Sequence, residues 1–406
     1  MKTTQLYVAC FVLMAGLWSC SDGGDETPKP EESPSTLVAD ESFGTWRSGD
    51  LRGFIGFSGL DISSEAMTHD VNLFKVRYTT MYQNQEIEAS TLVILPANEE
   101  GENEAFSVFS FQHGTIASDA EAPTNQAINS QTNIFLSSLA STGQVVVVPD
   151  LIGFGASADY VHPYYVEELT ATATIDAIYA ARELATANDL ALDGELYLGG
   201  YSQGGYSTMA THKHIEEKGV SFFELKASFP SSGGYDVKAF QEYFFGLETY
   251  HQPFYMAFVA YGYAEAYGWS DALPKLFNEP YASKIPQLFD GSQSGGLINK
   301  ELNDTLSVFL TADILANIDN YPDFKDALVA NSLTDWTPTI PMYMYHGDAD
   351  ITVPFENSQL TYDQLIANGA SKEVVTFTAF EGATHGTGVS PYIEAFIEVL
   401  LKLETQ

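Results

Sequence analysis

Cysteine is almost absent from the chain, whose 406 residues include only two, Cys10 and Cys20. Cys10 lies in an apolar run over residues 6–18 that follows Lys2 and is too short for an ordinary membrane span, which is the pattern of an export signal. Once that signal is removed, the mature chain has no internal disulfide, although an exported location would permit one. Burial of a hydrophobic core must therefore supply its stability.

The end of the apolar run contains a second targeting signal. Leu17-Trp18-Ser19-Cys20 resembles a bacterial lipobox, whose cysteine is lipidated after the signal is cleaved. Residues 21–36 are rich in Asp, Glu, Pro and Ser, and we predict that they form a disordered tether. The acidic residues directly after Cys20 resemble the export tag of surface lipoproteins. The resemblance implies a signal peptide over residues 1–20 and a membrane anchor on Cys20, at the bacterial outer membrane or the cell surface. Plain secretion is the alternative.

Basic residues are also scarce. Lys and Arg number 17 against 54 Asp and Glu, which gives a formal net charge of −37. A surface this acidic repels nucleic-acid phosphates and anionic headgroups, so nucleic acid is excluded as a partner. We interpret the charge as a source of solubility and not as a site for a cationic partner.

Short apolar runs alternate with amphipathic segments over most of the chain, which predicts an α/β fold with a mostly parallel central sheet flanked by helices. Residues 71–82 and 87–95 alternate apolar and polar side chains and predict a hairpin at the edge of this sheet. Residues 37–67 predict an irregular, extended segment. The strands are predicted at 106–111, 145–148, 195–198, 225–229, 341–345 and 373–380, and the helices at 126–141, 165–187, 206–217, 356–367 and 391–403.

The alternation is interrupted by residues 237–336, which begin with a dense aromatic stretch and continue as helical segments around 302–316 and 324–333. We interpret this insertion as a mainly helical cap over the carboxyl ends of the strands. The core would then consist of residues 37–236 and 337–406. The cap's aromatic side chains either pack its own helices or line an apolar pocket for an acyl or aryl group.

Ser202 lies between Gly200 and Gly204, after a short strand and before a helix. A serine in this G-x-S-x-G arrangement is typical of a nucleophile elbow. The turn is so tight that the serine is forced into a strained backbone region, and the glycines omit the Cβ atoms that would collide there. Strain of this kind holds the hydroxyl where a substrate carbonyl can reach it.

A nucleophilic serine needs a base, and the base needs an acid that orients it. Residues 346–354 resemble the H-G-x-x-D-x-x-V-P signature, which assigns the acid to Asp350, with Asp348 as the rival carboxylate. After the last predicted strand, His385 lies among small residues on a loop, where it could swing over Ser202. The chain order serine, acid, histidine is that of the α/β-hydrolase pattern.

An oxyanion hole in this arrangement combines the N–H of the residue after the serine with one from an early loop. These donors are predicted to be Gln203 and Thr115, because residues 112–115 are similar to an H-G-x motif. His113 is interpreted as an anchor of this loop. Asp150 is interpreted as a carboxylate that caps local N–H groups.

Together these motifs resemble the α/β-hydrolase superfamily. Residues 149–155 and His162-Pro163-Tyr164 resemble the P-D-Y-x-G-x-G and H-P-Y segments of capped lipases and esterases related to secreted lipases, with Leu151 in place of the commoner tyrosine. Residues 232–236 resemble the segment that leads into the cap of that group.

The resemblance implies an α/β-hydrolase fold with a cap inserted before the acid-bearing strand, and a serine carboxylic-ester hydrolase that works through an acyl-enzyme. The substrate would be a small-molecule, lipid or polysaccharide ester. No metal or cofactor is implied. One alternative is a serine peptidase of the prolyl-oligopeptidase type, although such enzymes usually carry a long β-propeller ahead of the hydrolase domain. The other is a surface lipoprotein that binds without turnover.

Overall fold

The computed structural model describes residues 35–58, 64–97 and 104–405. In this part of the chain, nine strands form one sheet in the order β1-β2-β3-β5-β4-β6-β7-β8-β9. The strands from β4 to β9 pair in parallel, whereas β1, β2 and β3 join antiparallel at one edge. The strands are β1 (Leu37–Trp46), β2 (Val71–Tyr82), β3 (Gln85–Pro96), β4 (Ala105–Gln112), β5 (Gln144–Pro149), β6 (Ala191–Tyr201), β7 (Glu224–Ser231), β8 (Met342–Gly347) and β9 (Val375–Phe380). The predicted α/β class and mostly parallel sheet are confirmed.

The expectation of an irregular segment over residues 37–67 is wrong. β1 pairs along β2 and forms the outer edge of the sheet, so the β2–β3 hairpin is one strand further in than predicted. β1 carries two irregularities in its register, and most of its side chains are exposed or only partly buried, so it lacks the apolar alternation that identifies a strand. The helix α1 (Ser48–Ser58) was hidden by its glycines, but Leu51 and Ile55, one turn apart, are buried.

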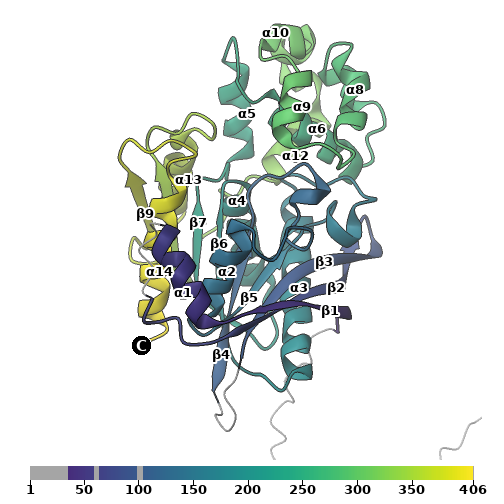
Figure 1. Ribbon diagram of the computed structural model, residues 1–406. Helices are drawn as coiled ribbons and strands as arrows, with labels where there is room; N and C mark the ends of the chain where they lie inside the picture. Colours follow the sequence, from purple (N-terminus) through teal and green to yellow (C-terminus); the bar gives the residue numbers. More distant parts are fainter. Residues whose placement is uncertain (1–34, 59–63, 98–103, 406) are drawn as a thin grey trace, which may run out of the picture.

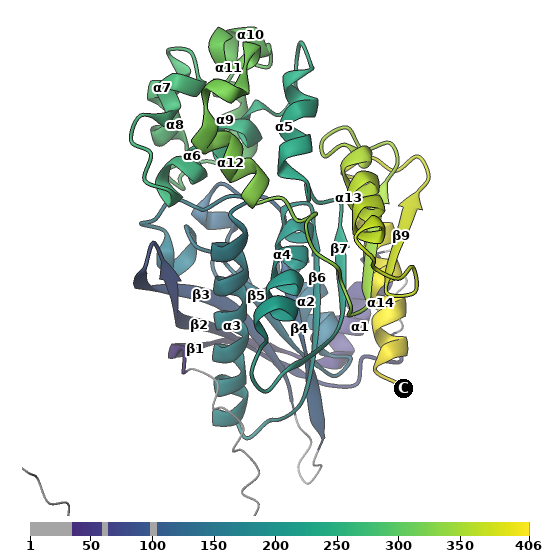
Figure 2. The same ribbon diagram turned by 180° about the vertical axis from the view of Figure 1, so that it is seen from behind.

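Helices cover both faces of the sheet, as the sequence predicts (Figures 1 and 2). The helices α1, α2 and α14 pack on one face and α3, α4 and α13 on the other. Every residue of β5 is buried, because both of its faces are covered. The bounds are α2 (Gln131–Ala140), α3 (Glu167–Ala187), α4 (Gln203–Lys218), α13 (Phe355–Ala367) and α14 (Val389–Leu403), with short 3-10 turns at η1 (Asp119–Glu121), η2 (Gly155–Ser157) and η3 (Ile318–Asn320).

A layer of helices stands above the end of the sheet at which β6 and β7 finish (Figure 1). It is built from the segment predicted as the cap, and its apolar side chains join one large cluster with the top of α4. The helical stretch predicted around residues 302–316 is two short helices. The helices of this layer are α5 (Val237–Phe245), α6 (Pro253–Ala266), α7 (Ala272–Leu276), α8 (Tyr281–Leu288), α9 (Gly295–Glu301), α10 (Leu306–Phe309), α11 (Ala312–Ala316) and α12 (Pro322–Ala330).

The predicted signal peptide, the lipidation residue Cys20 and residues 21–34 of the predicted tether lie outside the described residues. The last two tether residues are bound to α3, since the Ser35 hydroxyl and the Thr36 N–H donate to the Glu183 carboxylate at 2.8 and 2.7 Å. Among the described residues, no helix combines the length and the apolar character that crossing a membrane requires.

Candidate active site

Ser202 occupies the turn between β6 and α4 with φ 62° and ψ −122°, a conformation that costs a non-glycine residue free energy. Gly200 and Gly204 are required because a Cβ atom at either position would collide with the backbone. A Cβ on Gly200 would lie 2.4 Å from the carbonyl oxygen of Gly204, and a Cβ on Gly204 would lie 1.9 Å from that of Gln112. The turn therefore brings the serine against the end of β4 and fixes its position.

The structure brings Ser202, His385 and Asp350 together from three separate segments. The Nε2 atom of His385 lies 2.9 Å from the Ser202 hydroxyl oxygen, and its Nδ1 lies 2.6 Å from a carboxylate oxygen of Asp350. Asp348, the rival carboxylate, instead accepts the Gly382 N–H at 2.6 Å. Of the two carboxylates, Asp350 is the one that meets the histidine.

Asp350 is buried and fully supplied with donors. One of its oxygens accepts the backbone N–H groups of Thr352 and Val353 at 2.9 and 3.0 Å. Burial alone would raise the pKa of this carboxyl, but hydrogen bonds from His346 and His385 outweigh it and lower the pKa to about 2. Asp350 is therefore an anion at neutral pH, as a partner for an imidazolium must be.

The loop after β4 runs beside the serine. A Cβ on Gly114 would lie 3.8 Å from the Cβ of Ser202, so the residue before Thr115 packs beside the serine. Within the described residues, neither the N–H of Thr115 nor that of Gln203 donates a hydrogen bond to the protein. His113 anchors the loop, because its ring nitrogens lie 2.7 Å from the carbonyl oxygen of Gly114 and 3.0 Å from that of Asp150.

Comparison with known proteins agrees with this architecture. The family model of the secretory lipases matches residues 119–216, which include Ser202. A hydrolase structure from Legionella pneumophila is 24% identical, with a TM-score of 0.80, and the match covers 91% of this chain and 99% of that one. The rice cell wall degrading esterase LipA from Xanthomonas oryzae is also 24% identical, with a TM-score of 0.78 and the same coverage of both chains.

The chain has the α/β-hydrolase fold. Candida antarctica lipase A, in its closed state, is a more distant match at 16% identity, with a TM-score of 0.63 over 87% of this chain and 78% of that one. No curated protein matches the sequence. The solved structures and the family model are those of hydrolases, lipases and esterases, so the resemblance inferred from the motifs is confirmed at the level of the lipase and esterase group.

A second histidine, at the end of β8, also contacts Asp350, and sequence analysis gave it no role. His346 is buried, and its Nε2 lies 3.2 Å from the Asp350 carboxylate and 3.0 Å from the carbonyl oxygen of Val353. Its Nδ1 lies 2.6 Å from the hydroxyl of Ser358. The signal was present, because His346 opens the same motif that identified Asp350.

A further buried pair involves Gln203, the residue after the serine. The side-chain amide of Gln203 donates to Nε2 of His162 at 2.6 Å, and Nδ1 of His162 lies 2.6 Å from the carbonyl oxygen of Ile152. Burial lowers the pKa of His162 to about 3, so the ring is neutral, with Nδ1 as donor and Nε2 as acceptor. This pair fixes the side chain of the residue whose N–H was predicted to bind the oxyanion.

Asp150 lies away from His385 and has the local role that the sequence predicted. Its carboxylate accepts the N–H and the hydroxyl of Thr124 at 2.9 and 2.5 Å and the hydroxyl of Ser90 at 2.6 Å. Burial raises its pKa to about 6, against the effect of these donors. The carboxyl therefore joins the end of β5 to the loop that precedes α2.

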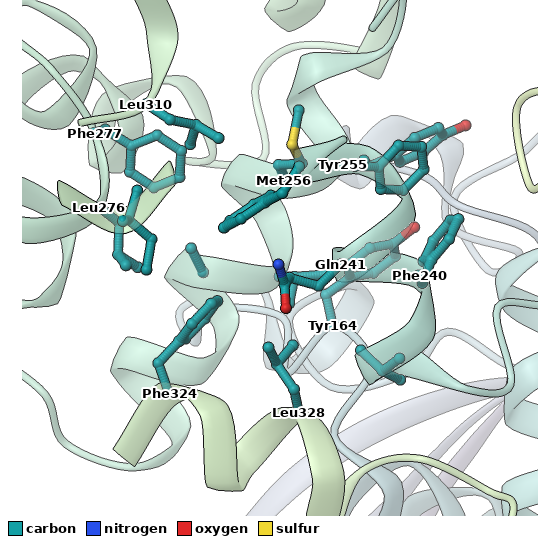
Figure 3. Close-up of a pocket in the computed structure, with 16 residues that line it drawn as sticks. Tyr164, Phe240, Gln241, Tyr255, Met256, Leu276, Phe277, Leu310, Phe324 and Leu328 are labelled. Carbon is teal, nitrogen blue, oxygen red and sulfur yellow. The ribbon is translucent and has the colours of Figure 1, made fainter. Parts of the chain in front are cut away.

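The cap contains an apolar cavity of about 60 Å³ (Figure 3). Its lining comes mainly from α5, α6 and α12, and Tyr164 contributes the wall on the core side. The hydroxyl of Tyr164 lies 2.7 Å from that of Thr115, so the cavity wall touches the predicted oxyanion loop. Some of the cap's aromatic residues thus line a pocket, and others, such as Phe309, are buried in the packing of its helices.

Proposed function

We propose that the chain is a serine carboxylic-ester hydrolase with Ser202, His385 and Asp350 as its triad. The Ser202 oxygen attacks the ester carbonyl carbon while Nε2 of His385 takes the hydroxyl proton. His385 then gives this proton to the leaving alcohol, and the acyl group remains bonded to the Ser202 oxygen. Water attacks the acyl carbon by the same route, and the carboxylic acid is released as the proton returns to Ser202.

Asp350 has two tasks in this scheme. It holds the His385 ring with Nε2 toward Ser202, and its charge stabilises the imidazolium that forms in each half-reaction. The backbone N–H groups of Gln203 and Thr115 bind the oxyanion of the tetrahedral intermediates. Removal of one such donor typically costs about a hundred- to thousandfold in turnover.

The observation that carries the proposal is the position of His385, within hydrogen-bond distance of both Ser202 and Asp350. The apolar cavity in the cap, whose wall residue Tyr164 contacts Thr115, supports an acyl or aryl ester as substrate. Two of the similar structures are those of an esterase and a lipase, which supports esters over peptides as substrates.

The test is hydrolysis of p-nitrophenyl esters and peptide anilides by the full mature chain, its Ser202→Ala variant and an exposed-serine control, Ser283→Ala. We expect ester turnover that Ser202→Ala abolishes and Ser283→Ala leaves unchanged, together with labelling of Ser202 by an alkyl phosphonate. Anilide turnover alone would support the peptidase. No turnover of either substrate and no labelling would support a binding protein.

We also propose that the chain is exported and anchored through a lipid on Cys20, and the description of the matching family as secretory supports export. Fractionation of cells that express the wild type or Cys20→Ser tests this anchor. We expect the wild type in the membrane fraction and the variant in the soluble fraction, and equal membrane recovery would contradict the proposal.

A further inference from the structure

The cap helix α5 is bound at both ends to the segment that carries Asp350. At its start, the Asp236 N–H donates to the side-chain oxygen of Asn357 at 3.2 Å, and the Asn357 amide donates to the carbonyl of Asp236 at 2.8 Å. Beyond its end, the Tyr250 hydroxyl donates to the carbonyl oxygen of Thr352 at 2.9 Å. α5 is accordingly the cap helix that stands beside α13 in both views (Figures 1 and 2).

Thr352, which accepts the hydrogen bond from Tyr250, is also bonded to the Asp350 carboxylate. The N–H of Thr352 donates to Asp350 at 2.9 Å, and the carbonyl of the same residue accepts from Tyr250. The hydroxyl of Thr352 also lies 3.2 Å from Nε2 of His251, the residue after Tyr250. The cap therefore contacts the carbonyl and the hydroxyl of Thr352, while the N–H of the same residue contacts the acid.

Tyr250 is itself held rigidly. It is 2% exposed, its ring packs against Phe244 with centroids 4.1 Å apart, and its N–H donates to the carbonyl of Asp304 at 2.8 Å. A buried hydroxyl in fixed surroundings restricts its acceptor more than an exposed one does, because neither partner can exchange for water without cost.

We propose that Tyr250 is a positioning residue of the triad, a role that rests on the proposed function. By holding the Thr352 carbonyl, it keeps the N–H groups of Thr352 and Val353 directed at one oxygen of Asp350, and the other oxygen is then directed at Nδ1 of His385. The cap thus contributes to the alignment of the acid as well as to the pocket for the acyl group.

The test uses Tyr250→Phe, which removes one oxygen and keeps the ring, with Tyr243→Phe as the matched control. Tyr243 lies on α5, is 40% exposed, and its hydroxyl bonds to no described residue. Loss of one buried hydrogen bond predicts a kcat about three- to tenfold lower in Tyr250→Phe. We expect KM to stay within about twofold, since Tyr250 acts on the acid and not on the substrate.

A second measurement is independent of turnover. The Nδ1 proton that His385 shares with Asp350 should give a low-field proton resonance, assigned by its loss in His385→Ala. We expect this resonance to shift or broaden in Tyr250→Phe and to be unchanged in Tyr243→Phe, with melting temperatures measured for all variants.

The outcomes separate this role from the proposed function. If the wild type shows no ester turnover dependent on Ser202, the proposed function fails, and the resonance still tests the alignment. If Tyr250→Phe keeps the wild-type kcat and resonance, the positioning role is wrong. A raised KM with an unchanged resonance would also overturn it, because Tyr250 would then act on substrate binding.

Discussion

Replacement of Asp150 by Asn should change how the stability of the protein depends on pH. Burial raises the pKa of this carboxyl from 3.8 to about 6 in the folded chain, even though Ser90 and Thr124 donate to it. As the pH rises through this interval, the unfolded chain releases the proton first, so the free energy of unfolding falls. The contribution of Asp150 is thus complete below pH 3.8 and lost as the pH passes 6.

The size of the effect follows from the two pKa values. The rise in the pKa of Asp150 from 3.8 to about 6 corresponds to about 3 kcal/mol of stability lost between pH 4 and pH 7. Asparagine does not titrate, and it keeps an oxygen for the Thr124 N–H while the two hydroxyls can accept from its amide. The stability of Asp150→Asn relative to the wild type should therefore rise by about 3 kcal/mol over this range.

Urea unfolding at pH 4, 5.5 and 7.5 measures this difference, and the exposed Asp159→Asn serves as the control for loss of one negative charge. Other titrating groups are common to wild type and variant, so their contributions cancel. The reasoning would be refuted if the difference in free energy of unfolding between Asp150→Asn and wild type stayed constant with pH. It would also be refuted if that difference came to favour the wild type as the pH rose. A difference of the same size in Asp159→Asn would assign the effect to net charge.

Two further predictions concern the serine turn and the cap. Gly204→Ala should lower the free energy of unfolding by at least about 1–3 kcal/mol and abolish ester turnover, because its Cβ would lie 1.9 Å from the Gln112 carbonyl oxygen. Urea unfolding midpoints test this, with Gly53→Ala as the control, because a Cβ on Gly53 meets nothing within 4 Å. The cavity is small, about 60 Å³, so kcat/KM for p-nitrophenyl esters should be highest for short acyl chains and fall by octanoate. A steady rise to hexadecanoate would contradict the second prediction.

The strands and helices of the core were predictable because each has a strong local pattern. β5 is a run of valines buried on both faces, and α14 presents one apolar stripe to the sheet. β1 and α1 lack such patterns. β1 is held mainly by backbone pairing at an exposed edge, and α1 is rich in glycine, so the information that defines them lies in their partners.

The candidate site was predictable to the extent that its residues lie in short motifs at strand ends. Ser202, Asp350 and His385 each follow a strand of one parallel sheet, and the topology brings such ends together. The contact between Tyr250 and Thr352 is different, because it joins residues 102 positions apart through the cap. Nothing in the neighbourhood of Tyr250 in the sequence distinguishes it from the other aromatic residues of that stretch.

Two contacts connect the cap to the loops around Ser202, one toward the predicted oxyanion loop and one toward the loop of Asp350. On the oxyanion side, the ring of Phe258 in α6 stacks on Tyr164 of the core with centroids 4.5 Å apart, and the hydroxyl of Tyr164 lies 2.7 Å from that of Thr115 in the predicted oxyanion loop. On the other, Tyr250 contacts the loop of Asp350. A displacement of the cap would therefore disturb oxyanion binding and acid alignment together. Changes made in the cap to alter acyl preference should consequently alter kcat as well as KM, whereas changes in a cap that only covered the site would alter KM alone.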